Sequence, residues 1–208
     1  MAITNFSELG TAIQAWAERQ DLSSQVTDFI TLTDMRIRSR MVESNMRLRE
    51  METTADVTPS SGVCTLPTDF MAMIRVQART SAPRRLEYKP QDWLDETYPD
   101  SASGNPSFYS IIGGSLRMYP LTTSDIRMTY WAYPAVLSVG NTTNWLLTKY
   151  PNVYLYGGLL ELELYALNDE GAQRWLQAFS VAMDSIGKSN TFDSFTSGTT
   201  KTASTHAQ

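Results

Sequence analysis

The residue types that most often carry enzyme chemistry are scarce in this sequence. His206 is the only histidine and Cys64 the only cysteine among the 208 residues. Nucleophiles activated by histidine and zinc sites both need such groups gathered at one place. His206 lies in a polar segment rich in Ser, Thr and Gly, and Cys64 in Gly-Val-Cys-Thr-Leu is typical of a small apolar strand residue. We therefore expect no histidine-based catalytic site, no metal and no cofactor.

Paired carboxylates, as in glycoside hydrolysis, are the catalytic arrangement that stays open. The candidates are Asp92, Asp95 and Glu96 on a short predicted helix, and Glu161 with Glu163 on a later one. Asp92 and Glu96 would share one helix face, whereas Glu161 and Glu163, two residues apart, would point in different directions. Such pairs are common on solvated helices, so a glycan-degrading enzyme is kept as an alternative only.

The aromatic residues allow a second alternative, a carbohydrate-binding module. Two groups are dense enough to consider: Tyr130, Trp131 and Tyr133, and Tyr150, Tyr154 and Tyr156. Tyr130 and Trp131 are neighbours on a predicted strand, so they point to opposite sides and cannot form one platform. Packing in a core or an interface is the favoured use of these rings.

Clustered charges indicate a possible contact surface. The basic cluster comprises Arg36, Arg38, Arg40, Arg47 and Arg49, and an acidic complement lies in Glu161, Glu163, Asp169, Glu170 and Asp184. One reading is a solvated helix face with local ion pairs. The other is a basic surface that meets an acidic neighbouring copy, or DNA passing nearby. Opposite charges on different helices would allow copies to associate head to tail, which gives a ring when the rotation closes.

Helical periodicity marks both ends of the chain. Residues 5–18 place Phe6, Leu9, Ile13 and Trp16 on one face after a capping Asn5 or Thr4. A second helix follows Ser23 or Ser24, a third begins at Pro151 with one apolar stripe, and a fourth follows Asn168 and ends near Gly187. These four helices most simply bury their stripes against one another.

Between the helices the pattern becomes that of strands. Seven short segments rich in Val, Ile, Thr and Tyr lie between residues 48 and 134. Gly113-Gly114 predicts a tight hairpin turn, because glycine accepts positive φ at both central positions. Pro90 can start a short helix among the strands.

The sequence thus predicts an α+β fold in which N- and C-terminal helix pairs form a helical bundle that carries an inserted antiparallel β-rich subdomain. The expected parts are residues 1–47 and 144–188 for the bundle, 48–143 for the insertion, and 189–208 for an extended C-terminal tail. The chain carries a net charge of −5, and its start lacks the basic and apolar regions of a signal peptide. We expect a soluble protein without a membrane span.

The order of several short segments resembles the head-to-tail adaptor proteins of short-tailed bacteriophages, the family that includes tail tubular protein A. The resemblance spans roughly residues 5–190 and is carried by Leu66–Phe70, Gly113–Pro120, Met128–Pro134, Asn144–Pro151, Tyr154–Ala166 and Asp169–Trp175. No string among these is specific alone. Their order around a β-rich middle carries the resemblance.

The resemblance implies a non-catalytic virion protein made in the bacterial host cytoplasm. It would form a ring, a dodecamer in such adaptors, beneath the portal protein at the head–tail neck. The ring would extend the DNA channel, pass double-stranded DNA without binding a particular sequence, and offer a platform to the next tail component. The polar C-terminal segment would reach the portal, with Phe192 and Phe195 as its anchors.

Overall fold

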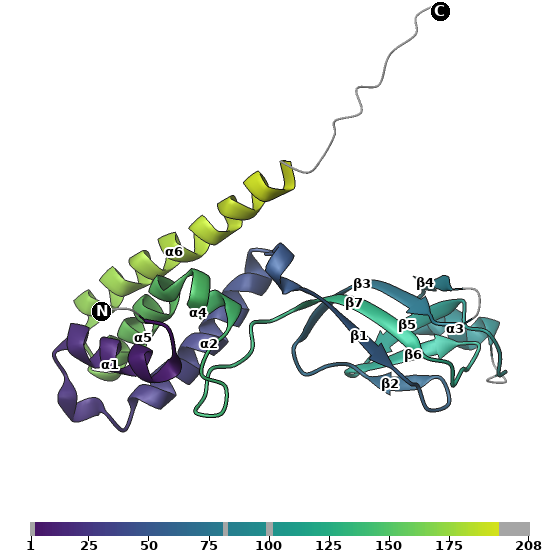
Figure 1. Cartoon of the computed structure of the whole chain (residues 1–208), viewed down its shortest axis with the longest axis horizontal. Helices are drawn as coiled ribbons and strands as arrows, with labels where there is room; N and C mark the ends of the chain where they lie inside the picture. The colour runs from purple at the N-terminus through teal and green to yellow at the C-terminus, as the bar shows by residue number, and fades with distance from the viewer. Residues whose placement is uncertain (1–2, 81–82, 99–101, 196–208) are drawn as a thin grey trace, which may run out of the picture. The chain divides into compact units, whose positions relative to one another are not determined.

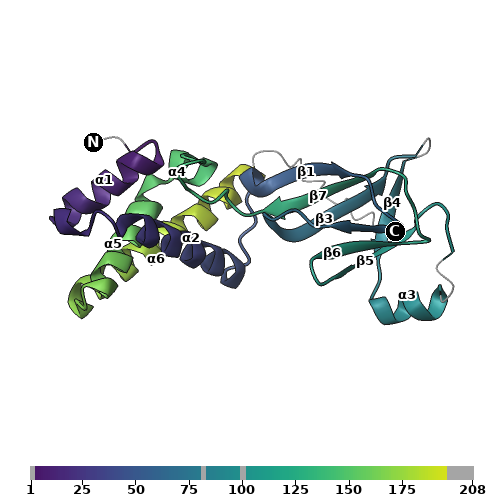
Figure 2. The same ribbon diagram turned by 90° about the horizontal axis from the view of Figure 1, so that it is seen from below.

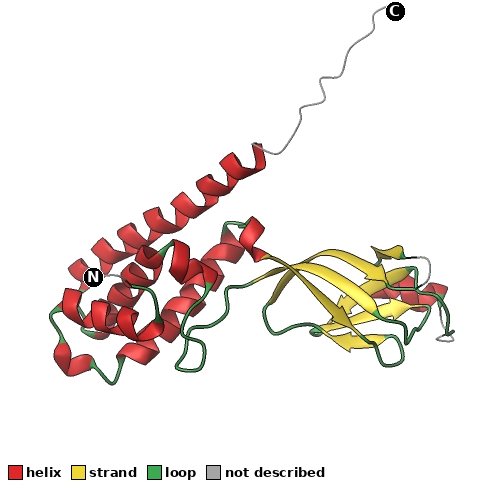
Figure 3. Cartoon of the chain, viewed as in Figure 1, coloured by secondary structure: helices red, strands yellow, loops and turns green. Residues whose placement is uncertain are grey.

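The computed structural model describes residues 3–80, 83–98 and 102–195, with side chains up to residue 187. The chain divides into two compact units. Residues 1–49 and 135–208 make up the first, here called the helical unit, and residues 50–134 make up the second, the β unit. Colouring by secondary structure shows helix α3 among the strands of the β unit (Figure 3).

The helical unit contains α1 (Phe6–Ala17), α2 (Val26–Glu43), α4 (Trp145–Lys149), α5 (Pro151–Tyr165) and α6 (Asp169–Phe195), with a 3₁₀ turn at Gln20–Leu22. Local sequence fixes several of these starts. Asn5 and Asn144 cap α1 and α4 by accepting the N–H groups of Glu8 and Leu147 at 2.9 and 2.8 Å. Pro151 stands in the first turn of α5, where its missing N–H costs nothing.

Helix α5 is the centre of the helical unit, and α1, α2, α4 and α6 all pack against it (Figure 1). Its buried residues include neighbours along the chain, among them Val153, Tyr154, Leu155, Leu159 and Leu160. The predicted stripe residues Leu155, Leu159 and Leu162 are buried, but burial extends beyond that stripe because four helices pack against α5.

Two adjacent glycines allow this close packing of α5. A Cβ on Gly157 would overlap the Thr33 methyl of α2, and a Cβ on Gly158 would overlap the Ile13 side chain of α1. The absence of side chains at these two positions lets the neighbouring helices approach the backbone of α5.

The β unit is built on one curled sheet of seven strands. A 3₁₀ turn at Arg49–Met51 leads into them. The strands are β1 (Glu52–Val57), β2 (Val63–Thr65), β3 (Phe70–Ala78), β4 (Arg84–Tyr88), β5 (Phe108–Ile112), β6 (Ser115–Tyr119) and β7 (Ile126–Ala132), in the order β1-β7-β3-β4-β5-β6-β2. Helix α3 (Gln91–Thr97) lies beside β5 and β6 (Figure 2). The sheet encloses its own core, which includes Val76, Leu86, Leu116, Met118 and Met128.

The predicted hairpin is confirmed. Gly113 and Gly114 have φ values of 54° and 78°, and Ile112 pairs with Ser115 across them. Positive φ at both central residues is what a two-residue turn requires, and glycine supplies it without a Cβ clash.

The predicted fold class, a helical bundle with an inserted antiparallel subdomain and an extended tail, is wrong. The structure is mixed α/β, with six α-helices in the described residues and a seven-stranded sheet that forms a compact unit with its own core. The sheet is also not wholly antiparallel, since β4 and β5 pair in parallel. The connection between them carries α3, and a crossover of this kind is what returns a chain in the same direction.

The last helix is longer than the sequence pattern predicted. Helix α6 continues to Phe195, although we expected the extended segment to begin at residue 189. Its Ser- and Thr-rich end lacks a proline, so local propensity did not require the helix to stop near Gly187. Residues 196–208 lie outside the described part of the chain.

Candidate interaction surface of the helical unit

A groove of about 410 Å³ runs between α2 and α6 and is called here the α2/α6 groove. Its floor is Glu161 of α5, and its walls are Leu32, Met35, Arg36, Ser39, Arg40 and Glu43 of α2 and Leu176, Phe179 and Ser180 of α6. The α2 residues recur at spacings of three and four, so the helical period places them on one side of the helix. The groove therefore combines apolar walls with a few charged groups.

The floor of the groove is an ion pair whose carboxylate is buried. The Arg36 Nε atom lies 2.7 Å from Glu161 Oε1, and Glu161 is only 8% exposed. A buried carboxylate in an otherwise apolar helix is costly unless a charged donor meets it. Arg36 thus compensates Glu161 and links α2 to α5 within one chain.

Arg40 lies one turn further along α2, and its contacts with carboxylates are longer than the contact of Arg36 with Glu161. Its Nη2 atom is 3.2 Å from Asp184 of α6 and its Nη1 atom is 3.6 Å from Glu43. Its Nε atom is buried and has no hydrogen-bond partner within the described structure. An unsatisfied buried donor is costly, so Arg40 is compensated less fully than Arg36 at the edge of the groove.

The structure brings together only part of the predicted basic cluster. Arg36 and Arg40 line the groove, whereas Arg38 lies on another side of α2, where its charge acts on Asp34 and Tyr154. Arg47 and Arg49 lie beyond the end of α2 and are exposed. The spacing explains the separation, because residues two apart on a helix do not share a face.

The predicted acidic residues are likewise divided. Glu161 pairs with Arg36, while Glu163 accepts a hydrogen bond from the Asn168 side chain at 2.8 Å. Asp169 and Glu170 are exposed in the first turn of α6, where the helix dipole favours negative charge. Their contact with a neighbouring copy stays a prediction.

A buried polar network connects three parts of the helical unit, and the sequence analysis missed it. Asp34 Oδ1 accepts the Tyr154 hydroxyl at 2.8 Å and Asp34 Oδ2 accepts the Leu137 N–H at 3.1 Å. The Asn144 amide donates to the Tyr154 oxygen at 2.8 Å and to the Ala135 carbonyl at 2.7 Å. Burial raises the pKa of Asp34, and burial together with the nearby Asp34 charge raises that of Tyr154.

A sequence signal for this network existed. Asp34 stands four residues after Ile30 and three before Ile37, in the middle of the apolar stripe of α2. A carboxylate at such a position must either be buried with partners or break the stripe. The network fixes the segment that begins at residue 135 against α2, α4 and α5.

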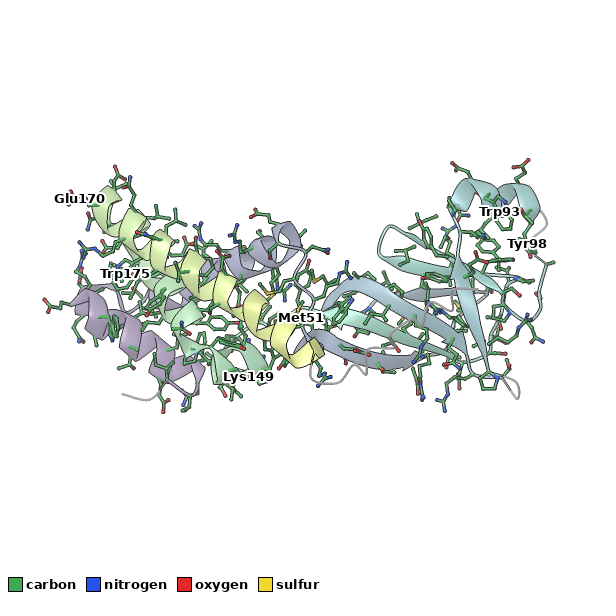
Figure 4. All side chains as sticks on the ribbon, turned by 90° about the horizontal axis from the view of Figure 1, so that it is seen from above. Met51, Trp93, Tyr98, Lys149, Glu170 and Trp175 are labelled. Carbon is green, nitrogen blue, oxygen red and sulfur yellow. The ribbon has the colours of Figure 1, made fainter. Side chains whose placement is uncertain are left out.

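In the β unit, aromatic rings gather around α3. The rings of Trp93 and Phe108 meet edge to face with centroids 5.3 Å apart, and the Lys89 ammonium lies 5.4 Å from the centroid of the Trp93 ring. Tyr98 packs near Phe108 and Tyr119. Figure 4 shows Trp93 on α3 and Tyr98 just beyond its C-terminal end. The edges and faces of these rings therefore pack against one another within the β unit.

The aromatic groups considered as sugar platforms are divided by burial, and the candidate carboxylates lie either exposed on α3 or against different partners. Tyr130 and Tyr154 are buried, whereas Trp131 and Tyr156 are only partly covered. Asp92, Asp95 and Glu96 are exposed on α3, where Asp95 accepts a hydrogen bond from Gln91. Glu161 and Glu163 point to different partners, as noted above.

A comparison with protein families supports the adaptor reading. The family described as SU10 adaptor protein matches residues 4–202. The chain belongs to this family. No curated protein matches it individually. The resemblance found in the sequence is thus confirmed as far as a phage adaptor-type protein. Membership implies a structural, non-enzymatic role and a place in the virion.

The remaining features considered in the sequence of this adaptor are Cys64, His206, the two tail phenylalanines, metal ligands and membrane spans. Cys64 is half-buried on β2, and burial raises the pKa of its thiol, which disfavours the nucleophilic thiolate. His206 and the side chains of Phe192 and Phe195 lie outside the described residues. Within the described ranges, no cluster of three or more potential metal ligands occurs, and no helix is both long and apolar enough to cross a bilayer.

Proposed function

We propose that this adaptor forms a ring beneath the portal of the phage head, extends the DNA channel and presents a platform for the next tail component. The observation that carries the proposal is the match of the adaptor family to residues 4–202, which include both compact units. A structural adaptor must contact proteins on two sides. A chain of two units, each with its own core, can give one unit to assembly and the other to a partner.

The charge of the chain supports passage of DNA without capture. A net charge of −5 disfavours tight binding to a polyanion, because phosphate contacts need clustered Lys and Arg. Arg36 and Arg40 of the predicted cluster already face carboxylates of their own chain. The proposed role for DNA is therefore transit through the ring.

The C-terminal segment is the proposed contact with the portal, with Phe192 and Phe195 as anchors. Helix α6 would present these residues near its end.

The test is electron microscopy of the chain mixed with the portal protein of the same phage. We expect a second ring coaxial with the portal ring. A chain truncated after Ser189, which lacks Phe192 and Phe195, should fail to dock, whereas one truncated after Thr196 should still dock. An intact chain that neither assembles on the portal nor binds it would contradict the proposal. Equal docking by both truncated chains would contradict the anchor alone.

A further inference from the structure

Helix α6 has a second groove on the side away from the α2/α6 groove. This groove, called here the α5/α6 face, measures about 500 Å³ and is lined by Asn152 and Tyr156 of α5 and by Arg174, Ala178, Val181 and Ser185 of α6, among others. A helix turns about 100° per residue, so Ala178 lies roughly 200° around the axis from both Leu176 and Ser180. The two grooves therefore flank α6 on opposite sides.

Both surfaces expose apolar side chains that a solitary chain would be expected to cover. Met35 and Leu176 of the α2/α6 groove are 60% and 45% exposed, and Val181 of the α5/α6 face is 64% exposed. Small residues beside them, Ser180 on one side and Ala178 on the other, leave room for a helix to approach. Apolar patches in grooves of this kind mark protein contacts.

The charges of the two surfaces are complementary. The α2/α6 groove and its edge hold the guanidinium groups of Arg36 and Arg40 against the carboxylates of Glu43, Glu161 and Asp184, which gives two positive and three negative charges. The α5/α6 face is lined by one charged residue, Arg174, and by no carboxylate. No ion pair of Arg174 is found in the described part of the chain.

We propose that copies of the chain join head to tail, with the α2/α6 groove of one copy packed on the α5/α6 face of the next. The inference rests on the proposed ring and names the surfaces that would build it. Arg174 of one copy would meet Glu43 and Asp184 at the acidic edge of its neighbour's α2/α6 groove. The contact would also cover the exposed Met35 and Leu176 of that groove and the exposed Val181 of the α5/α6 face. A symmetric pairing of two α5/α6 faces would instead bring Arg174 against its own copy, which complementarity disfavours.

This arrangement is heterologous, because each copy uses two different surfaces. Such a contact repeats from copy to copy and closes into a ring when the rotation permits. Since both surfaces share α6, one helix would contribute to both contacts and link neighbouring copies around the ring.

Variants with one added cysteine and a short bismaleimide test the contact directly, on the free chain at high concentration and on the portal-bound assembly. Ser180→Cys places a thiol in the α2/α6 groove and Ala178→Cys places one on the α5/α6 face. We expect little cross-linking within either variant alone and a cross-linked dimer when the two are mixed. The wild-type chain reports the background from Cys64, and Thr11→Cys, exposed on α1, reports non-specific collisions.

Charge variants then show whether the cross-link reports this contact. Leu176→Asp introduced into the Ser180→Cys chain, or Val181→Asp into the Ala178→Cys chain, should lower the yield by about tenfold or more. Both positions are exposed, so the fold should survive, and circular dichroism checks this.

The outcomes separate the inference from the proposed function. Cross-linking within either single variant would indicate a symmetric contact and overturn the head-to-tail assignment. Absence of the mixed dimer while rings still form on the portal would overturn the assignment and leave the adaptor ring intact. A mixed yield no higher than that of Thr11→Cys counts as absence of the mixed dimer and would likewise overturn the assignment. Failure of the wild-type chain to form any ring would overturn both.

Discussion

Asp34 joins three segments of the helical unit through one carboxylate. It accepts the Tyr154 hydroxyl from α5 and the Leu137 N–H from the segment that precedes α4. Both donors are buried, and a buried donor that loses its acceptor costs about 1–3 kcal/mol. The network therefore has a direct effect on the stability of the helical unit, and that effect depends on the protonation of Asp34.

The pH dependence can be predicted from the pKa of Asp34, which burial raises above its ordinary value of 3.8. In the unfolded chain the carboxyl ionises first as pH rises, so the contribution of Asp34 to folding is fully present below 3.8 and is lost as pH rises through the folded-state pKa. Asp34→Asn does not titrate. The wild-type advantage over Asp34→Asn in the free energy of unfolding should be largest near pH 4 and shrink toward neutrality, as measured by urea denaturation across that range.

A variant whose effect on stability should change with pH in the opposite direction provides the control. Arg19 lowers the pKa of the exposed Asp21 carboxyl through a hydrogen bond of 2.8 Å. The contribution of Asp21 is therefore present above its ordinary pKa and is lost as pH falls. The wild-type advantage over Asp21→Asn should grow as pH rises. Unfolding free energies of wild type and Asp34→Asn that stay parallel at every pH would contradict the prediction.

At the scale of the element, α5 is where a sequence pattern misled. Its residues Leu155, Leu159 and Leu162 form a stripe at helical spacing, and they are buried as the stripe predicts. Val153, Tyr154 and Leu160 are buried as well, on other sides of the helix. Periodicity reports one buried side well, but a helix that four others contact is buried on further sides, which weakens the contrast between apolar and polar sides on which the method depends.

The sheet also combines features that the sequence predicts with one that it does not. Local signals gave the strands and the Gly113-Gly114 hairpin, because turn chemistry is written in neighbouring residues. The parallel pairing of β4 with β5 depends on contacts between distant residues and could not be read from the strands themselves.

The ion pairs of the α2/α6 groove were also only partly predictable. The cluster containing Arg36 and Arg40 was visible in the sequence, whereas its partners Glu161 and Asp184 follow from helix packing.

Gly157 should be intolerant of alanine although alanine favours helices. The gain in helix propensity is about 1 kcal/mol, but the new Cβ would overlap the methyl of Thr33, which is fully buried and stiff about its Cα–Cβ bond. Overpacking of this kind costs about 1–3 kcal/mol. We expect Gly157→Ala to lower the free energy of unfolding, as measured by chemical denaturation.

Two further variants make this a test of packing. Gly187→Ala on α6 meets open space and should stabilise the chain by about 0.5–1 kcal/mol. Thr33→Ser removes the methyl and keeps the hydroxyl that bonds to the Phe29 carbonyl at 2.8 Å. It should rescue part of the loss caused by Gly157→Ala. Equal effects of alanine at positions 157 and 187 would show that the overlap with Thr33 is not the cause.

At the scale of the whole molecule, the β unit has the properties of an independently folding segment. Its seven strands and its core all lie within residues 50–134. The two ends of the segment also lie together, because β1 pairs with β7 from Glu52 opposite Trp131 to Val57 opposite Ile126. Segments whose ends are close and whose contacts are internal tolerate excision and insertion.

We therefore expect residues 50–134 to fold when expressed alone, with dispersed amide resonances in NMR spectra and a cooperative urea transition. Met128→Ala, which empties part of the buried core, should lower the stability of the segment by about 2–5 kcal/mol, whereas Thr54→Ala at an exposed position of β1 should change it by less than about 1 kcal/mol. A segment that shows no cooperative transition would mean that the strands need the helical unit in order to fold. If the segment folds, the adaptor can be dissected, and each unit can be assayed separately for portal binding and for ring formation.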